Sequence, residues 1–193
     1  MLSEDKIQLL GRVARAQSGT APSGDGETRI SILSLAAASY GAKPAEESTI
    51  PTGFDPLAVV LFEAIVEGAY LVAAADGVVD LEEKHVFERV VTAACGGVVL
   101  ERQITDLVGD LAALLERDGM DKRVAEVGAQ VRKKEHGQEV LRIAALLAVA
   151  SNDVSRVELD VLQKLAKSFQ LEPSDADTAL ADVRALLSAN VAA

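Results

Sequence analysis

Apolar residues recur along the chain every three or four positions, which is the spacing of a helix, and no stretch alternates as a half-buried strand does. This pattern predicts two helices before residue 54 and seven after it. Pro, Ser or Asp opens several of them and Gly closes several, as is typical of helix ends. The predicted segments are residues 3–16, 29–40, 56–76, 81–95, 99–117, 121–134, 138–150 and 156–169, and a last helix that begins at residue 173.

The pattern predicts an all-α fold with two parts. Residues 55–193 would form a compact bundle of about seven helices with short connections, and residues 1–54 would form an N-terminal helical extension with linkers. The extension is either docked on the bundle or a mobile arm, and we expect it to dock through its apolar stripes. Aromatic residues are only 3% of the chain, and Ala, Leu and Val dominate, which favours helices packed closely through small side chains.

A helix–turn–helix pattern occurs twice, with an offset of 75 positions. Residues 71–91 and residues 146–166 each contain an apolar helix, a short polar turn and a second amphipathic helix. The two copies align at Leu71 and Leu146, Ala75 and Ala150, Glu83 and Glu158, and Val86 and Val161. The correspondence predicts an internal duplication, in which two related helical halves pack on each other.

The first turn carries several acidic side chains. Gly77 fits the left-handed position that ends a helix, and Asp80 with Glu83 fits a capping box for the next helix. Capping explains both acids without a ligand, at about 1 kcal/mol per cap. It does not explain Asp76, because a carboxylate at the C-terminal end of a helix faces the negative pole of the helix dipole. A bound cation, an arginine from another helix or the amides of the next turn would compensate for this unfavourable interaction with the dipole.

Carboxylate and carbonyl oxygens are the ligands that Ca²⁺ and Mg²⁺ prefer, and Zn²⁺ prefers them less. The spacing is not that of an EF-hand loop. In the second turn Asn152 and Ser155 replace the Gly and Asp of the first, and Asp153 adds a carboxylate. A weakly bound divalent cation and plain capping both remain open. The candidate metal ligands are Asp76, Asp80, Glu82, Glu83, Asp153 and Glu158.

The formal net charge of −11 argues against a nucleic-acid-binding protein, which normally carries a basic patch. An acidic surface favours solubility and attracts cations or basic partners. The single cysteine, Cys95, cannot form an internal disulfide and lies on an apolar stripe, so we expect a core residue. The first residues do not form a signal peptide, and the longest apolar run, residues 143–150, is too short to cross a bilayer. We therefore expect a cytoplasmic protein without membrane insertion.

The chain contains no nucleophile elbow, phosphate-binding loop or zinc-protease motif. His85 and His136 are expected at the surface, which leaves a zinc site without ligands. Glu63 and Glu67 are one helical turn apart and could pair, but a di-iron bundle also needs Glu-x-x-His partners that are absent. We therefore expect no catalysis, and an uncharacterised hydrolase is the most distant alternative.

The segment ADGVVDLEE at residues 75–83 resembles the signature of the TerB-like family of tellurite-resistance proteins. The segment ASNDVSRVELDVLQKLAKSFQL at residues 150–171 resembles the degenerate second signature of that family. The likeness covers roughly residues 55–190 and implies an all-helical fold of about seven helices with an internal duplication. It also implies an acidic, metal-chelating face that falls on Asp76, Gly77, Asp80, Glu82, Glu83, Ser151, Asn152, Asp153 and Glu158. The second copy lacks the Asp-Gly pair.

The resemblance implies a binding role in resistance to tellurite, phage and colicins, often beside membrane-bound TerC-like partners. We therefore predict a non-catalytic TerB-like domain that binds a divalent cation and acts as a scaffold or sensor in a stress-resistance assembly. The cation would neutralise the carboxylates of the first turn and fix the angle between two helices. Its partners would be other proteins, with a homo-oligomer also open. The alternative is a purely structural helical adaptor or oligomerisation module that binds no metal.

Overall fold

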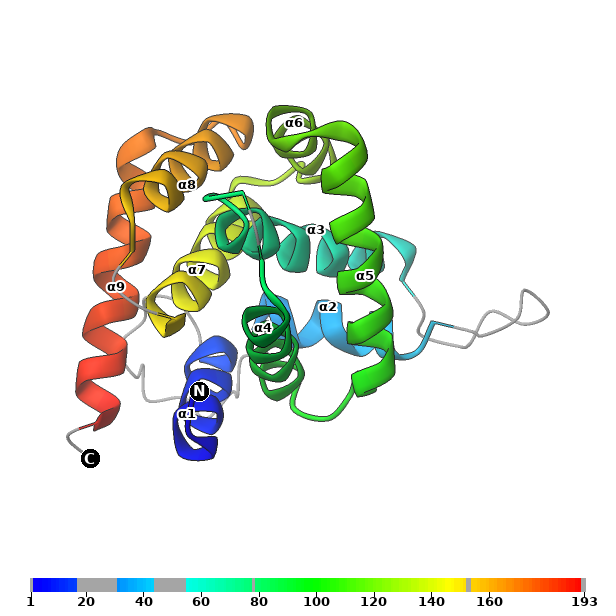
Figure 1. Cartoon of the computed structure of the whole chain (residues 1–193), viewed down its shortest axis with the longest axis vertical. Helices are drawn as coiled ribbons and strands as arrows, with labels where there is room; N and C mark the ends of the chain where they lie inside the picture. Colours follow the sequence, from blue (N-terminus) through cyan, green and yellow to red (C-terminus); the bar gives the residue numbers. More distant parts are fainter. Residues whose placement is uncertain (1, 17–30, 44–54, 78, 152–153, 192–193) are drawn as a thin grey trace, which may run out of the picture.

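The computed structural model describes residues 2–16, 31–43, 55–77, 79–151 and 154–191 (Figure 1). Over these residues the protein is helical and has no strand, which confirms the all-α prediction. The helices of the described part are α1 (Glu4–Arg15), α2 (Ile32–Gly41), α3 (Pro56–Ala73), α4 (Leu81–Ala94), α5 (Glu101–Asp118), α6 (Met120–Gln130), α7 (Lys134–Ser151), α8 (Arg156–Ser168) and α9 (Pro173–Val191).

Helix α3 lies at the centre of the fold and packs against α2, α5, α6, α7 and α8 (Figure 1). Every residue from Ala64 to Val72 is buried, so α3 is surrounded by protein rather than presenting one amphipathic face. Leu57, at the start of this helix, is 73% exposed, and the buried apolar residues begin at Val59. By length and composition α3 could cross a membrane, and here the same composition makes it the core helix.

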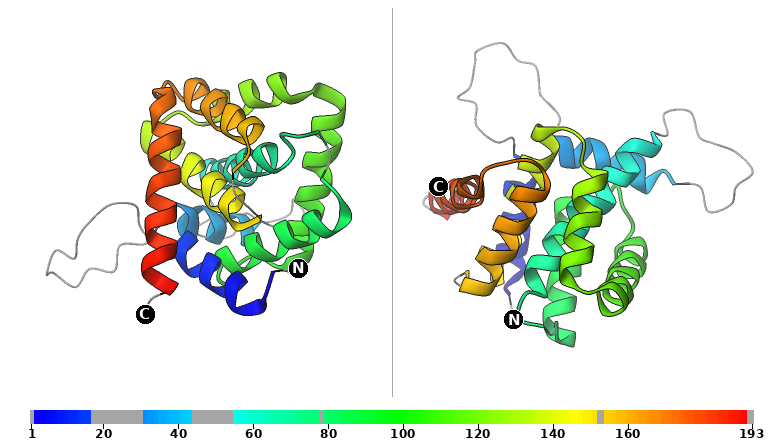
Figure 2. Two further views of the ribbon diagram at one scale, coloured as in Figure 1. Left: turned by 60° about the vertical axis from the view of Figure 1, so that its left-hand side comes forward. Right: turned by 90° about the horizontal axis from the view of Figure 1, so that it is seen from above.

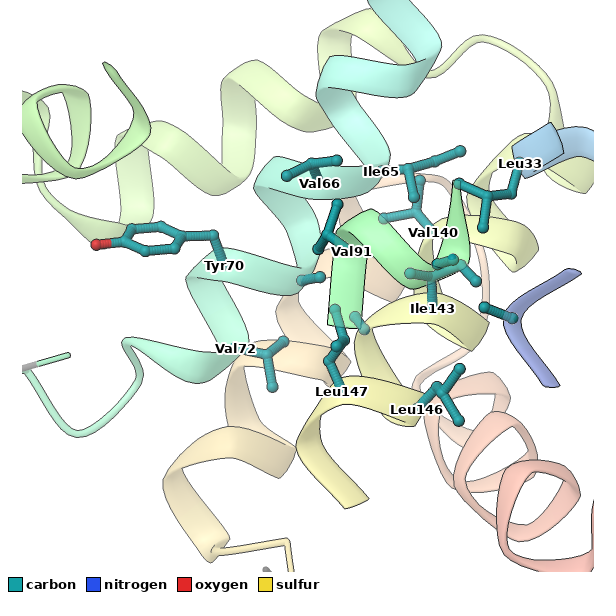
Figure 3. Packing of buried hydrophobic residues seen from close by; sticks show 14 of the residues in the cluster. Leu33, Ile65, Val66, Tyr70, Val72, Val91, Val140, Ile143, Leu146 and Leu147 are labelled. Carbon is teal, nitrogen blue, oxygen red and sulfur yellow. The ribbon is translucent and has the colours of Figure 1, made fainter. Parts of the chain in front are cut away.

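Small side chains let α7 approach α3 closely. A Cβ atom added to Gly68 of α3 would lie 2.5 Å from Cγ1 of Val140 on α7. Larger apolar side chains of the two helices, among them Ile65 and Ile143, belong to the same buried cluster as Val140 (Figure 3). The packing agrees with the abundance of Ala, Leu and Val and the scarcity of aromatic residues in the chain.

Helices α1 and α2 share one hydrophobic core with the rest of the chain. The apolar stripe of α1 consists of Ile7, Leu10 and Val13, and each of these side chains is at most 2% exposed. Helix α1 packs against α4, and α2 packs against α3. Helix α9 lies along α7 and α8 and reaches α1 at its far end (Figure 2). The N-terminal helices are therefore integral to the packing, while a division of the chain at residue 54 stays a prediction.

A buried ion pair on α7 joins α1 and α2. Arg142 donates through Nε to Oε2 of Glu139 at 2.8 Å, and the two side chains are 4% and 7% exposed. Arg142 also donates to the carbonyl oxygens of Val13 at 3.0 Å and Ala14 at 2.5 Å, at the end of α1. Glu139 accepts from the backbone N–H of Leu33 at 3.4 Å, at the start of α2. Each charge therefore lies at the helix pole of opposite sign.

The break between α6 and α7 lies nearer to the N-terminus than the sequence predicts. Helix α6 ends at Gln130 and α7 begins at Lys134, so the helix continues through Gly137 instead of starting at residue 138. A Cβ atom at Gly137 would lie 2.8 Å from Cβ of Phe169, which follows α8. This glycine therefore allows close packing and does not break the helix.

Two glycines within helices should respond oppositely to alanine. At Gly11 a Cβ atom would lie 2.8 Å from the backbone of Ala93, so Gly11→Ala should lower the free energy of unfolding by about 1–3 kcal/mol through overpacking. At Gly109 of α5 no atom lies within 4 Å, so Gly109→Ala should raise it by about 0.5–1 kcal/mol through helix propensity. Urea unfolding followed by circular dichroism measures both. Equal effects would contradict the close α1–α4 contact.

Arg142→Met should lower the free energy of unfolding by about 3–5 kcal/mol, because it leaves the Glu139 carboxylate buried without a partner. The double variant Glu139→Leu/Arg142→Met should recover more than half of that loss, because both charges are then gone. Arg102→Met, at an exposed position of α5, should change the value by less than about 0.5 kcal/mol. A loss at Arg142 no larger than at Arg102 would show that the pair does not hold α1 and α2.

Candidate functional site

The two turns of the repeated pattern border one cleft of about 550 Å³. Its volume is within the roughly 300–1,000 Å³ that is usual for ligand clefts. The apolar lining comes from Leu2, Ala73, Val79, Val86, Phe87, Val90, Leu147 and Ala150. The polar lining comes from Asp76, Asp80, Glu82, Glu83, Ser155 and Glu158, and no Lys or Arg of the described chain is among the lining residues.

Helix α4 begins with the predicted capping box. Oδ1 of Asp80 accepts from the backbone N–H groups of Glu82 at 2.8 Å and Glu83 at 2.9 Å. Oε2 of Glu83 accepts in return from the backbone N–H of Asp80 at 2.9 Å. These bonds satisfy donors that the first turn of a helix leaves unpaired. Asp80 and Glu83 are therefore held at the edge of the cleft by the start of α4.

Helix α8 begins in the same way. Oγ of Ser155 accepts from the backbone N–H of Glu158 at 3.3 Å, and Oε2 of Glu158 accepts from the backbone N–H of Ser155 at 2.7 Å. Ser155 and Glu158 thus form the same capping box in the second turn that Asp80 and Glu83 form in the first. The two boxes have a structural role that needs no ligand, and each still presents a carboxylate to the cleft.

Asp76 lies in the turn after α3, which ends at Ala73 rather than at the predicted residue 76. The backbone N–H of Gly77 donates to the carbonyl of Ala74 at 3.0 Å, and Gly77 then adopts φ +105°, as its predicted role at the helix end requires. The Asp76 side chain is exposed, and within the described chain no hydrogen bond or ion pair reaches it. Water can therefore solvate this carboxylate, so the helix dipole alone does not require a bound cation.

Asp118, the last residue of α5, shows a different solution to the same electrostatic problem. Arg117 and Lys122 approach its carboxylate at 3.0 Å and 2.9 Å, and Arg123 approaches at 3.4 Å. The hydrogen bonds from Arg117 and Lys122 hold the pKa of Asp118 well below its usual range. Basic side chains thus surround this helix-end carboxylate, whereas no basic residue of the described chain lines the cleft beside Asp76.

The predicted metal ligands are brought together only in part. Five of the six line the cleft, and Asp153 lies outside the described residues, as do Asn152 and the side chain of Ser151. In the described part of the chain, no three Asp, Glu, His or Cys side chains are grouped closely enough to hold a metal ion. A cation at this rim would therefore need side chains to rearrange around it.

The remaining candidate residues are Cys95, His85 and His136, which differ in burial. Cys95 is 4% exposed, and burial raises the pKa of its thiol to about 12, so it lacks the low pKa of a reactive thiolate. His85 is exposed as predicted, whereas His136 is half-buried. Burial and the positive charge of Lys133 lower the pKa of His136.

A buried ion pair between α3 and α6 was not predicted. Glu67 does not pair with Glu63 but accepts from Nε of Arg123 at 2.7 Å, and burial raises the pKa of Glu67 while Arg123 opposes that shift. Glu63 instead pairs with Lys43 at 3.3 Å. The signal in the sequence was a glutamate within a helix that is otherwise almost wholly apolar, and it indicated burial with a partner.

No family model, curated protein or solved structure matches this chain. The TerB-like resemblance therefore stays a prediction based on the two short segments that carry it. The cleft is the feature of the described chain that bears on function, because it combines an apolar floor, an acidic rim and two capping boxes that hold part of that rim in place.

Substitutions at the two aspartates of the first turn should separate capping from other roles. Asp80→Ala should lower the free energy of unfolding by about 1 kcal/mol, because it removes the acceptor for two backbone N–H groups. Asp76→Ala should change it by less than about 0.5 kcal/mol, because the side chain is exposed. Chemical denaturation in metal-free buffer measures both values. An equal loss at Asp76 would reveal a structural partner for this side chain.

Proposed function

We propose that this protein is a non-catalytic binding scaffold and that its binding site is the cleft between the α3–α4 turn and the start of α8. The observation that supports this function is the composition of the lining. Apolar side chains form the floor, and carboxylates from two separate turns form the rim. A cleft of this kind offers apolar contact to a ligand and selects for positive charge.

The surroundings of the cleft favour a preformed site. Capping boxes fix the starts of α4 and α8, and the floor belongs to helices that pack in the core. The acidic rim agrees in sign with the net charge of −11 for the whole chain. A basic ligand would therefore be attracted over a distance of about one Debye length and then held by apolar contact.

We also propose that the chain is TerB-like, with α3–α9 as two related halves. Two observations support the duplication. Helices α4 and α8 open with capping boxes at positions that the 75-residue offset brings into register, and the preceding helices α3 and α7 pack on each other. Under this proposal the scaffold serves a tellurite-resistance or stress-resistance assembly, and other proteins, including a TerC-like membrane protein, are its partners.

A divalent cation is the second candidate ligand. Five carboxylates share one rim without a basic residue of the described chain in the lining, which favours a positive ion there. Ca²⁺ or Mg²⁺ suits oxygen ligands better than Zn²⁺ does. The ion would draw exposed side chains such as Asp76 and Glu82 together and fix the angle between α3 and α4. The adaptor without metal is the alternative, and a hydrolase would require turnover that carboxylate substitutions abolish.

Metal titration tests the cation proposal. At about ten times its Kd, Ca²⁺ or Mg²⁺ should raise Tm by about 4 °C, because a ligand that binds only the folded state stabilises it. Asp76→Asn should abolish the shift, and Asp182→Asn, at an exposed position of α9 outside the cleft lining, should preserve it. Differential scanning calorimetry with Ca²⁺, Mg²⁺, Mn²⁺ and Zn²⁺ measures these shifts. If no ion raises Tm, the adaptor without metal is the better description.

A further inference from the structure

We propose that the cleft docks an amphipathic helix of a partner protein, with apolar residues along one face of that helix and Lys or Arg beside them. The inference rests on the proposed scaffold function and names the class of partner. It does not require the cation. Three observations support it: the shape of the floor, the charge of the rim and two exposed apolar side chains next to that rim.

The floor is formed by side chains of different helices. Val86, Phe87 and Val90 lie on α4, and Leu147 and Ala150 lie on α7. Two helices that meet at a groove offer rows of apolar contacts, and such a groove accepts the apolar face of a third helix. The anchors of the incoming helix would follow helical spacing, with apolar residues three and four positions apart.

The charge of the rim selects a basic helix. Asp76, Asp80, Glu82 and Glu83 come from the α3–α4 turn and the start of α4, and Glu158 comes from the start of α8. An acidic or neutral helix would bring no positive charge to this acidic lining, whereas an amphipathic helix with Lys or Arg beside its apolar anchors would.

A second copy of this chain fits the cleft poorly. Its net charge is −11, so two copies repel each other. Its exposed basic run, residues 132–134, follows Val131, and that side chain is only 7% exposed. The run therefore offers positive charge without the apolar anchor that the floor requires.

Two exposed apolar side chains outside the cleft lining are neighbours in sequence of rim carboxylates. Leu81 is 88% exposed between Asp80 and Glu82, and Val157 is 48% exposed beside Glu158. Both belong to the first turn of a capped helix, where the capping residues already stabilise the helix start. Each places an apolar group next to a carboxylate, which matches an amphipathic helix with basic residues next to its anchors.

The test uses two synthetic peptides of about 18 residues, long enough for several helical turns. One carries Leu and Phe on one face with Lys beside them, and the other has Glu in place of every Lys. Fluorescence anisotropy of the labelled peptides against the full-length protein should give at least tenfold tighter binding for the lysine peptide. That affinity should weaken as salt is raised, because salt screens the rim. Equal affinity of the two peptides would overturn the proposal.

Variants locate the binding. Asp76→Lys/Glu82→Lys reverses charge at two exposed rim positions, and Ala73→Phe fills the half-buried floor without changing charge. Each variant should weaken binding of the lysine peptide at least tenfold, while Asp182→Lys on α9 should leave its affinity unchanged. If circular dichroism shows that Ala73→Phe does not fold, the variant Asp76→Lys/Glu82→Lys at the exposed rim still tests the proposal. Binding that survives the rim variant, or falls equally in Asp182→Lys, overturns the proposal.

Three further outcomes are distinguishable. If the protein alone self-associates in sedimentation experiments and the rim variant abolishes this, the cleft accepts a second copy and the proposal is wrong. If metals raise Tm but neither peptide binds, the cation proposal stands and the helix-docking proposal fails. If the lysine peptide binds and no metal raises Tm, the docking proposal stands without the cation. Ala73→Phe also distinguishes the docking proposal from the cation proposal, because it should weaken peptide binding without altering any metal-induced Tm shift.

Discussion

The ion pair of Glu139 and Arg142 is the interaction on which the placement of the N-terminal helices depends. It occupies buried space on α7, and its remaining hydrogen-bonding groups bind backbone atoms at the end of α1 and the start of α2. Buried charges are costly unless they are paired and fully hydrogen-bonded. Here the pairing partner and both helix ends must be present together, so the core around α7 is complete only when α1 and α2 are docked.

The close approach of α3 and α7 determines where the cleft lies. Gly68 lets α3 and α7 approach closely in the last third of α3, and both helices continue from that contact to their C-terminal ends. The turns that follow therefore emerge near each other, and the starts of α4 and α8 line the same space. Packing in the core thus explains how acidic residues far apart in the sequence come to share one rim.

Local features could be predicted from the sequence, and long-range ones could not. The caps at Asp55, Asp80 and Ser155 were predictable because each depends on residues two or three positions away. The bond between Glu67 and Arg123 joins residues 56 positions apart, and that between Arg142 and Val13 joins residues 129 apart. Periodicity identifies a buried face but not the residue opposite it, so neither the ion pairs nor the apolar floor of the cleft could be derived.

The ion pair of α7 has a consequence for the chain between α1 and α2. Because one pair of side chains binds both the last turn of α1 and the first turn of α2, the two anchor points of this connection are fixed by a third helix. The relative placement of α1 and α2 is thus set by their contacts with α7, and it does not depend on the length of chain that joins them.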